Sequence, residues 1–208
     1  MVDVVADKVG WVNIAYIGTA AALGYFVDYR FFVALTSWVH YLKYIHQYYF
    51  RGATGNMKLY KAWQRDVLMY KTIALVNLGF IYTAPYVGAW RAGAPMPALD
   101  FVSLGMIVSG YFVSIAATEA LGIDGTYFGI ELGFVKADYC FVKKFPYNVF
   151  PHPMILGQVF GLFGIFKPPW VHENWPWLIP VHILLYFAHM TQEIYDVWKG
   201  DPWYKKKN

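Results

Sequence analysis

The sequence predicts an all-α integral membrane protein, a polytopic bundle of about six transmembrane helices. Of its 208 residues, 58% are hydrophobic and only 14% are charged, whereas a soluble domain carries about a quarter charged residues. Aromatic residues reach 21%, which suits a chain with two membrane–water interfaces. The formal net charge is +4, but the basic residues stand between apolar runs. The charge therefore indicates membrane topology and headgroup contact, not nucleic acid.

The first two predicted helices are the runs 11–27 and 31–50. The first is uncharged and of membrane length. The second is ambiguous, because it contains His40, Lys43 and His46. It is either a span with one hydrated end, from which Lys43 reaches the interface, or an interfacial helix. We favour the span.

The remaining apolar runs follow in order along the chain. A hydrophilic loop at 51–65 precedes a third span at 67–90, and a Pro- and Gly-rich turn leads to a fourth at 99–121. The last two runs, 154–166 and 178–195, flank a connector with three Trp residues and together predict a helical hairpin.

The distribution of charges supports this topology. If every run crosses the membrane, the loops at 51–66 and 122–150 share one side with both termini and collect most Lys and Arg residues. The other side keeps only Arg30, Arg91 and Lys167. Such asymmetry follows the positive-inside rule and predicts that both termini lie on the cytoplasmic-type face.

We expect one membrane domain over residues 1–208. It would comprise N-terminal helices at 1–98, a C-terminal core at 99–198 and a basic tail at 199–208. Acidic residues precede the first apolar run and no small-residue cleavage site follows it, so we do not expect a cleaved signal peptide. The single Cys140 excludes an internal disulfide and a cysteine-based metal cluster.

The segment 119–158 is the most informative part of the chain. It is polar and contains Gly122, Gly125, Gly129 and Gly133 at spacings of three or four residues. One small residue per helical turn opens a groove along a helix. The groove is either a face for a neighbouring helix or a place where a flat ligand approaches the backbone.

The same segment carries a family resemblance. Gly125-Thr126, then Phe145-Pro146-Tyr147-Asn148, then His152-Pro153-Met154-Ile155-Leu156-Gly157-Gln158 resemble the core of the phosphatidylethanolamine N-methyltransferase family. That family belongs to a wider group with the isoprenylcysteine carboxyl methyltransferases. Its pattern is Gly-Thr, Phe-Pro-(Phe/Tyr)-Asn and (His/Asn)-Pro-Met-Tyr-x-Gly-Ser. The resemblance is strongest over 119–165 and implies a methyltransferase-like core.

The resemblance implies an S-adenosylmethionine-dependent phospholipid N-methyltransferase. The glycines would let the cofactor approach the backbone, a carboxylate or His would take the proton of the headgroup ammonium, and lysines would hold the lipid phosphate. The implied catalytic residues are His152, Glu193 and Glu131. The implied cofactor-binding residues are Gly122, Gly125, Thr126, Gly129, Asn148, His152 and Pro153, and the implied phosphate ligands are Lys136, Lys143 and Lys144. We expect no metal site.

Four positions depart from the family pattern. Ile155 and Gln158 stand where the family has Tyr and Ser, and Phe187 and Ala188 stand where it has an acidic pair linked with cofactor binding. Whether the chain is an enzyme therefore stays open. The alternative is a non-catalytic, methyltransferase-derived subunit of a larger organellar complex, as scaffold or lipid-binding piece. A methyltransferase acting on a prenylated substrate is a third, weaker reading. The expected partners are membrane phospholipids and other complex subunits, and the expected home is the endoplasmic reticulum or the mitochondrial inner membrane.

Overall fold

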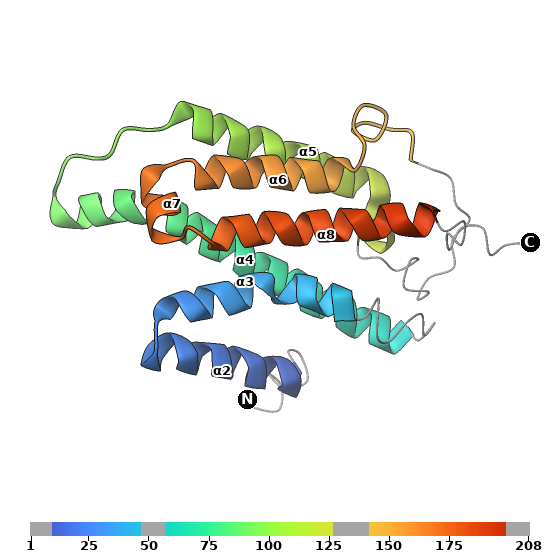
Figure 1. Cartoon of the computed structure of the whole chain (residues 1–208), viewed down its shortest axis with the longest axis horizontal. Coiled ribbons are helices and arrows are strands. Elements are labelled where there is room, and N and C mark those ends of the chain that lie inside the picture. The colour runs from blue at the N-terminus through green and yellow to red at the C-terminus, as the bar shows by residue number, and fades with distance from the viewer. Residues whose placement is uncertain (1–9, 47–56, 127–141, 199–208) are drawn as a thin grey trace, which may run out of the picture. The chain divides into compact units, whose positions relative to one another are not determined.

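A computed structural model describes residues 10–46, 57–126 and 142–198. Within these ranges the chain forms seven helices and no strand, which confirms the all-helical class (Figure 1). The helices are α2 Trp11–Phe26, α3 Tyr29–His46, α4 Met57–Ala92, α5 Phe101–Thr126, α6 Pro153–Phe166, α7 Pro169–Asn174 and α8 Leu178–Trp198.

The N-terminal boundary of α4 corrects the prediction of a loop at 51–65. The helix begins at Met57, ten residues before the predicted span. Tyr60, Trp63, Val67 and Tyr70 are all buried, and their spacing of three and four residues places them on one helical face. Of the polar residues between them, Lys61 is exposed and Gln64 and Arg65 are half-buried, whereas Asp66 is buried. The stretch 57–65 is therefore the amphipathic start of α4 and not part of a hydrophilic loop.

Two helices are long and apolar enough to cross a membrane, namely the stretches Tyr60–Ala92 and Phe101–Ile123. Most side chains along both are not buried within the protein, as expected where lipid covers them. The expected six crossings are not confirmed. α2 and α6 have 16 and 14 residues and are therefore only about 24 and 21 Å long, short of a hydrocarbon core of about 30 Å.

The described residues divide into two compact units, with the boundary inside α4 after Gly79. In the first unit α2 and α3 form a hairpin. At Gly24 a Cβ atom would lie 2.7 Å from Cβ of Phe32, so the two helices approach closely there. The Tyr16 hydroxyl donates to the Leu35 carbonyl at 2.9 Å. Asn77 of α4 donates to hydroxyl oxygens of α3 at 3.0 Å. Interhelical hydrogen bonds thus supplement apolar packing in this unit.

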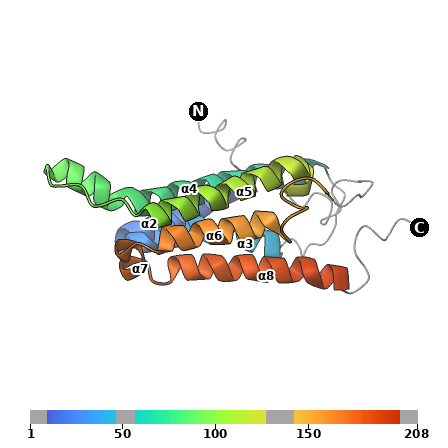
Figure 2. The same cartoon turned by 90° about the horizontal axis from the view of Figure 1, so that it is seen from above.

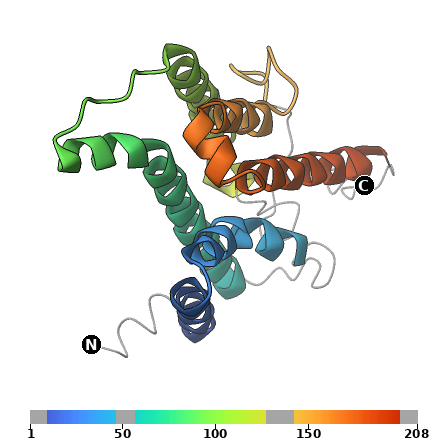
Figure 3. The ribbon, with the colours of Figure 1, turned by 60° about the vertical axis from the view of Figure 1, so that its left-hand side comes forward.

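The second unit is built on the antiparallel pair α5 and α6, with α8 packed against α6 (Figures 1 and 3). A Cβ atom on Gly110 would lie 2.5 Å from the Gly157 carbonyl oxygen and 2.5 Å from the Gly161 backbone nitrogen. A Cβ on Gly164 would lie 2.7 Å from the Ser103 carbonyl oxygen. The two backbones therefore touch, as small residues allow at helix contacts in membranes. We call this contact the glycine seam.

A polar contact closes one end of the seam. Asp100 caps α5 by accepting the Ser103 backbone N–H at 3.0 Å, and it pairs with Lys167 at the end of α6. The Ser103 hydroxyl donates to the Gly164 carbonyl at 2.6 Å. Lys167, and next the Ser103 N–H, lower the pKa of the Asp100 carboxyl from its ordinary value. The ion pair therefore stabilises the fold at pH values above the ordinary pKa of an aspartate. This stabilisation is lost as the pH falls through the lowered pKa of Asp100.

Candidate functional site

The predicted site lies at the other end of the seam. The contacts pair Ser103 with Gly164 and Ser114 with Gln158, so α6 begins opposite the turn of α5 that follows Ser114. The stretch 122–126 extends beyond that point. Figure 2 shows the C-terminal ends of α5 and α8 and the start of α6 at this same end. The elements that carry the predicted residues are thus brought together.

Gly122 marks a break in α5. Its φ of 76° and ψ of 172° are non-helical, a conformation that essentially only glycine adopts without strain. A Cβ atom there would meet nothing within 4 Å among the described residues. The backbone at this position is exposed, so a ligand can approach it directly.

The residues after the break return to helical geometry. The hydroxyl of Thr126 donates to the Gly122 carbonyl at 2.7 Å, and Thr126 is buried. A Cβ on Gly125 would lie 2.5 Å from Cγ of Leu121, a side chain of the same helix. Among the described residues, the nearest atoms to a Cβ on either glycine belong to no neighbouring helix, unlike those at Gly110 and Gly157. This favours the ligand interpretation of the spacing at 122 and 125 over the helix-packing one.

The segment before α6 is a compact turn. The backbone N–H groups of Val149 and Phe150 both donate to the Pro146 carbonyl at 3.0 Å. The backbone N–H of Asn148 donates to the Lys144 carbonyl at 3.3 Å. Pro146 is buried, whereas Lys143, Lys144 and Asn148 are exposed. The two lysines are therefore accessible to an anionic group. Exposed lysines in a loop are equally typical of the positive-inside rule, by which basic residues set membrane topology.

His152 is the N-cap of α6 and has left-handed backbone angles, with φ of 47° and ψ of 48°. His and Asn tolerate this region better than most residues. Pro153 follows as the first helical residue, where its missing N–H costs nothing, and it is buried. The backbone alone thus accounts for a His-Pro pair here. The backbone conformation does not by itself indicate a chemical role for the half-buried imidazole.

The positions that depart from the family pattern have structural uses. The Gln158 side-chain amide donates to the Ser114 hydroxyl at 3.1 Å, so it joins α6 to α5. Ile155 is buried at 6% exposure. Phe187 and Ala188, at the positions of the family's acidic pair, are exposed on α8. Among the described side chains of α8, residues 178–191, there is no carboxylate.

Several predicted residues fall outside what the structure describes. Gly129, Glu131 and Lys136 lie in the range 127–141, and Glu193 lies in α8 at a position whose side chain is not described. Their roles stay predictions. Among the described residues no three His, Cys, Asp or Glu side chains are grouped to hold a metal.

The sequence reasoning missed the glycine seam. The seam is formed by Gly157, Gly161 and Gly164 of α6 with Ser103, Gly110 and Ser114 of α5. The three glycines are spaced by four and three residues, and the other set by seven and four, so each set lies on one helical face, which is the signal for a helix contact. Matching the two sets in antiparallel order would have found the seam.

Comparison with known proteins supports the resemblance. Residues 99–195 match the model of the phospholipid methyltransferase family, and they include α5, α6, α7 and most of α8. No curated protein and no solved structure matches the chain significantly. The family match and the two long apolar helices agree with an integral membrane protein. The stretch 99–195, somewhat less than half of the chain, is thus similar to the phospholipid methyltransferase family, and we call it the family domain.

Proposed function

We propose that the chain is an S-adenosylmethionine-dependent phospholipid N-methyltransferase of the phosphatidylethanolamine type. The observation that carries this proposal is the exposed backbone break at Gly122, which lies in the family domain beyond the glycine seam. An exposed backbone position without a side chain, at the end of apolar helices, suits a cofactor that must meet a lipid headgroup at the membrane surface.

The residues at this end fit the cofactor in part. Gly122 offers an open backbone, and Glu119, one turn earlier on α5, is exposed and supplies a carboxylate. S-adenosylmethionine supplies an electrophilic methyl group when bound. The chain's own task is to position the headgroup and accept its ammonium proton, for which His152 is the described candidate. Lys143 and Lys144 would hold the lipid phosphate by charge-assisted hydrogen bonds.

A second function is favoured by the departures from the pattern. Gln158 contributes to interhelical packing, and Phe187 presents an apolar surface at a position that the family uses for an acid. These observations suit a non-catalytic subunit of a larger membrane complex, such as one of the mitochondrial inner membrane. In that case the family domain would serve as scaffold or lipid-binding piece.

Methyl transfer to phosphatidylethanolamine distinguishes the two functions. We expect the purified chain in lipid nanodiscs to transfer labelled methyl groups, and His152→Asn to slow the reaction about a hundredfold, because a positioned base contributes about that much. Asn keeps the left-handed backbone, so the fold should survive. His172→Asn, the same change on α7, is the matched control and should leave the rate unchanged. Folded wild-type protein without transfer would favour the complex subunit.

A further inference from the structure

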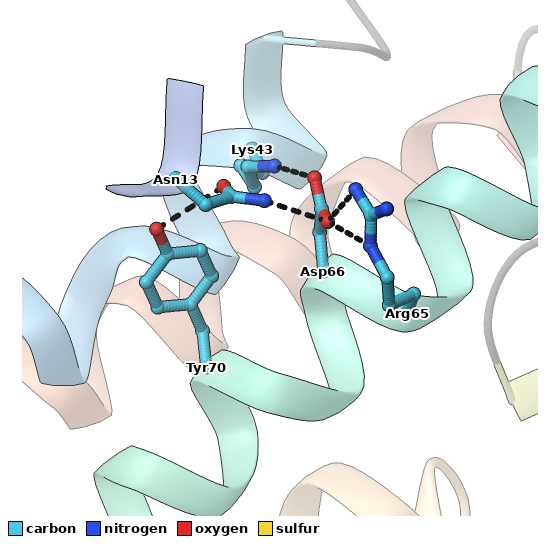
Figure 4. A network of polar contacts seen from close by, with 5 residues as sticks. All are labelled: Asn13, Lys43, Arg65, Asp66 and Tyr70. Carbon is cyan, nitrogen blue, oxygen red and sulfur yellow. Dashed lines mark hydrogen bonds and ion pairs between the residues drawn. The ribbon is translucent and has the colours of Figure 1, made fainter. Parts of the chain in front are cut away.

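A polar cluster in the first unit lies outside the family domain. Its members are Asn13, Lys43, Arg65, Asp66 and Tyr70, and we call it the Asp66 cluster (Figure 4). Asp66 accepts hydrogen bonds from the Asn13 amide at 2.8 Å and from Arg65 at 2.9 and 2.7 Å, and it pairs with Lys43. The Tyr70 hydroxyl donates to the Asn13 amide oxygen at 3.2 Å. Three helices thus converge on one carboxylate.

The backbone at the start of α2 makes room for this arrangement. Gly10, the N-cap of α2, has a φ of 87°, and a Cβ atom there would lie 3.1 Å from a terminal nitrogen of Arg65. The guanidinium therefore packs closely over Gly10. Asn13, only 3% exposed, joins the carboxylate to Tyr70 from the opposite side. The cations are held in fixed positions and do not extend freely from the surface.

The charges of the cluster do not cancel. It combines one carboxylate with two cations, so among the described residues it carries a net charge of about +1. Lys has three N–H donors and Arg has five, and Asp66 receives one from Lys43 and two from Arg65. The side chain of Asp66 is 12% exposed, whereas those of Lys43 and Arg65 are 27% and 38% exposed. The carboxylate is thus the more buried partner, and both cations are partly exposed.

The position of the cluster on α4 corresponds to the depth of the phospholipid headgroups in a membrane. The stretch Tyr60–Ala92 has 33 residues, about 50 Å of helix, which exceeds a hydrocarbon core of about 30 Å and leaves room for its ends at headgroup depth. Arg65 and Asp66 come directly before the apolar residues that begin at Val67. An uncompensated cation at that depth is stabilised by a paired anion. The abundant anion there is the phosphate of a phospholipid.

We propose that the Asp66 cluster binds the phosphate of an anionic glycerophospholipid. Lys43 and Arg65 donate to the phosphate oxygens, and the guanidinium offers its remaining donors as a planar fork. Asp66 does not touch the lipid but holds the two cations side by side. Because the net charge is about +1, a headgroup with a net negative charge is preferred over a zwitterionic one. This site is independent of methyl transfer, since it uses no residue of the family domain.

Binding of dioctanoyl phosphatidylglycerol to the full chain in detergent micelles tests the proposal. Arg65→Gln keeps the Lys43–Asp66 pair intact but removes the excess charge, so we expect affinity to fall about tenfold. Lys61→Gln removes the same charge from an exposed position one turn earlier on α4 and should leave affinity unchanged. Equal losses in both variants, or none in Arg65→Gln, would overturn the site.

Two further arms identify the ligand without relying on variant stability. A photoactivatable phosphatidylglycerol should crosslink to wild-type peptides around Lys43 and Arg65, and labelling confined to other peptides would contradict the proposal. Dioctanoyl phosphatidylcholine should bind more weakly, and millimolar inorganic phosphate should not displace the anionic lipid. Displacement by inorganic phosphate at the lipid's own concentration would show a site for soluble phosphate and overturn the lipid assignment.

Discussion

Replacing Gly157 with Leu is expected to separate α5 from α6 and to produce a large loss of stability. A Cβ atom at Gly157 would lie 2.6 Å from the Gly110 carbonyl oxygen and 2.9 Å from the Ser114 backbone nitrogen. These are backbone atoms and cannot rotate away. Overpacking of a close contact costs about 1–3 kcal/mol or more, and Leu adds further carbon atoms beyond Cβ. We expect the free energy of unfolding in detergent to fall by at least about 3 kcal/mol.

Gly105→Leu is the matched control for this experiment. Gly105 is also on α5, but a Cβ atom there would meet nothing within 4 Å, and Leu has the higher helix propensity. Stability should be unchanged or slightly higher. If Gly157→Leu had the same free energy of unfolding as the wild type, α5 and α6 would not meet through these glycines.

Asp66→Asn is expected to have the second largest effect. The substitution leaves Lys43 and Arg65 beside one another without the carboxylate that both contact. Removing one partner of a fully buried ion pair costs about 3–5 kcal/mol. The cations here are 27% and 38% exposed, so we expect a smaller loss of about 2 kcal/mol. Chemical unfolding of the variant in micelles measures it.

The reason for that loss can be checked by neutralising the whole cluster. Lys43→Gln, Arg65→Gln and Asp66→Asn combined leave hydrogen-bonding amides and no unpaired charge, so part of the stability should return. Asp28→Asn, which disrupts an exposed ion pair with Arg30, should have little effect. A combined variant less stable than Asp66→Asn alone would show that the charges themselves stabilise the unit.

The backbone features around the predicted site were predictable because their signals are local, whereas the glycine seam, which joins distant segments, was not predicted. The break at Gly122, the turn at Pro146 and the start of α6 at Pro153 all fall where glycine and proline mark them, and the ordered motif led to the family that residues 99–195 match. His152 illustrates the limit of such reasoning. The motif marks the position, but the left-handed backbone explains the residue as well as catalysis does.

The N-terminal half was less predictable because its determinants are not local. Asp66 appeared only as the edge of a hydrophilic loop, yet its partners Asn13 and Lys43 are 53 and 23 residues away in the sequence. A hydropathy value averaged over neighbouring residues does not reveal the distant partners of a single charged residue. The helical period of Tyr60, Trp63, Val67 and Tyr70 was the available signal, and it was hidden by the polar residues between them.

Binding of S-adenosylmethionine to the chain in lipid nanodiscs, followed by titration calorimetry, tests the central claim most directly. We expect saturable binding by the wild type and by Gly105→Leu, and loss of binding in Gly125→Leu, which adds a bulky side chain beside the break in α5, where the nearest described atoms to its Cβ belong to Leu121. Absence of binding at millimolar cofactor by folded wild-type protein, or undiminished binding by Gly125→Leu, would contradict a cofactor site at this end of the domain.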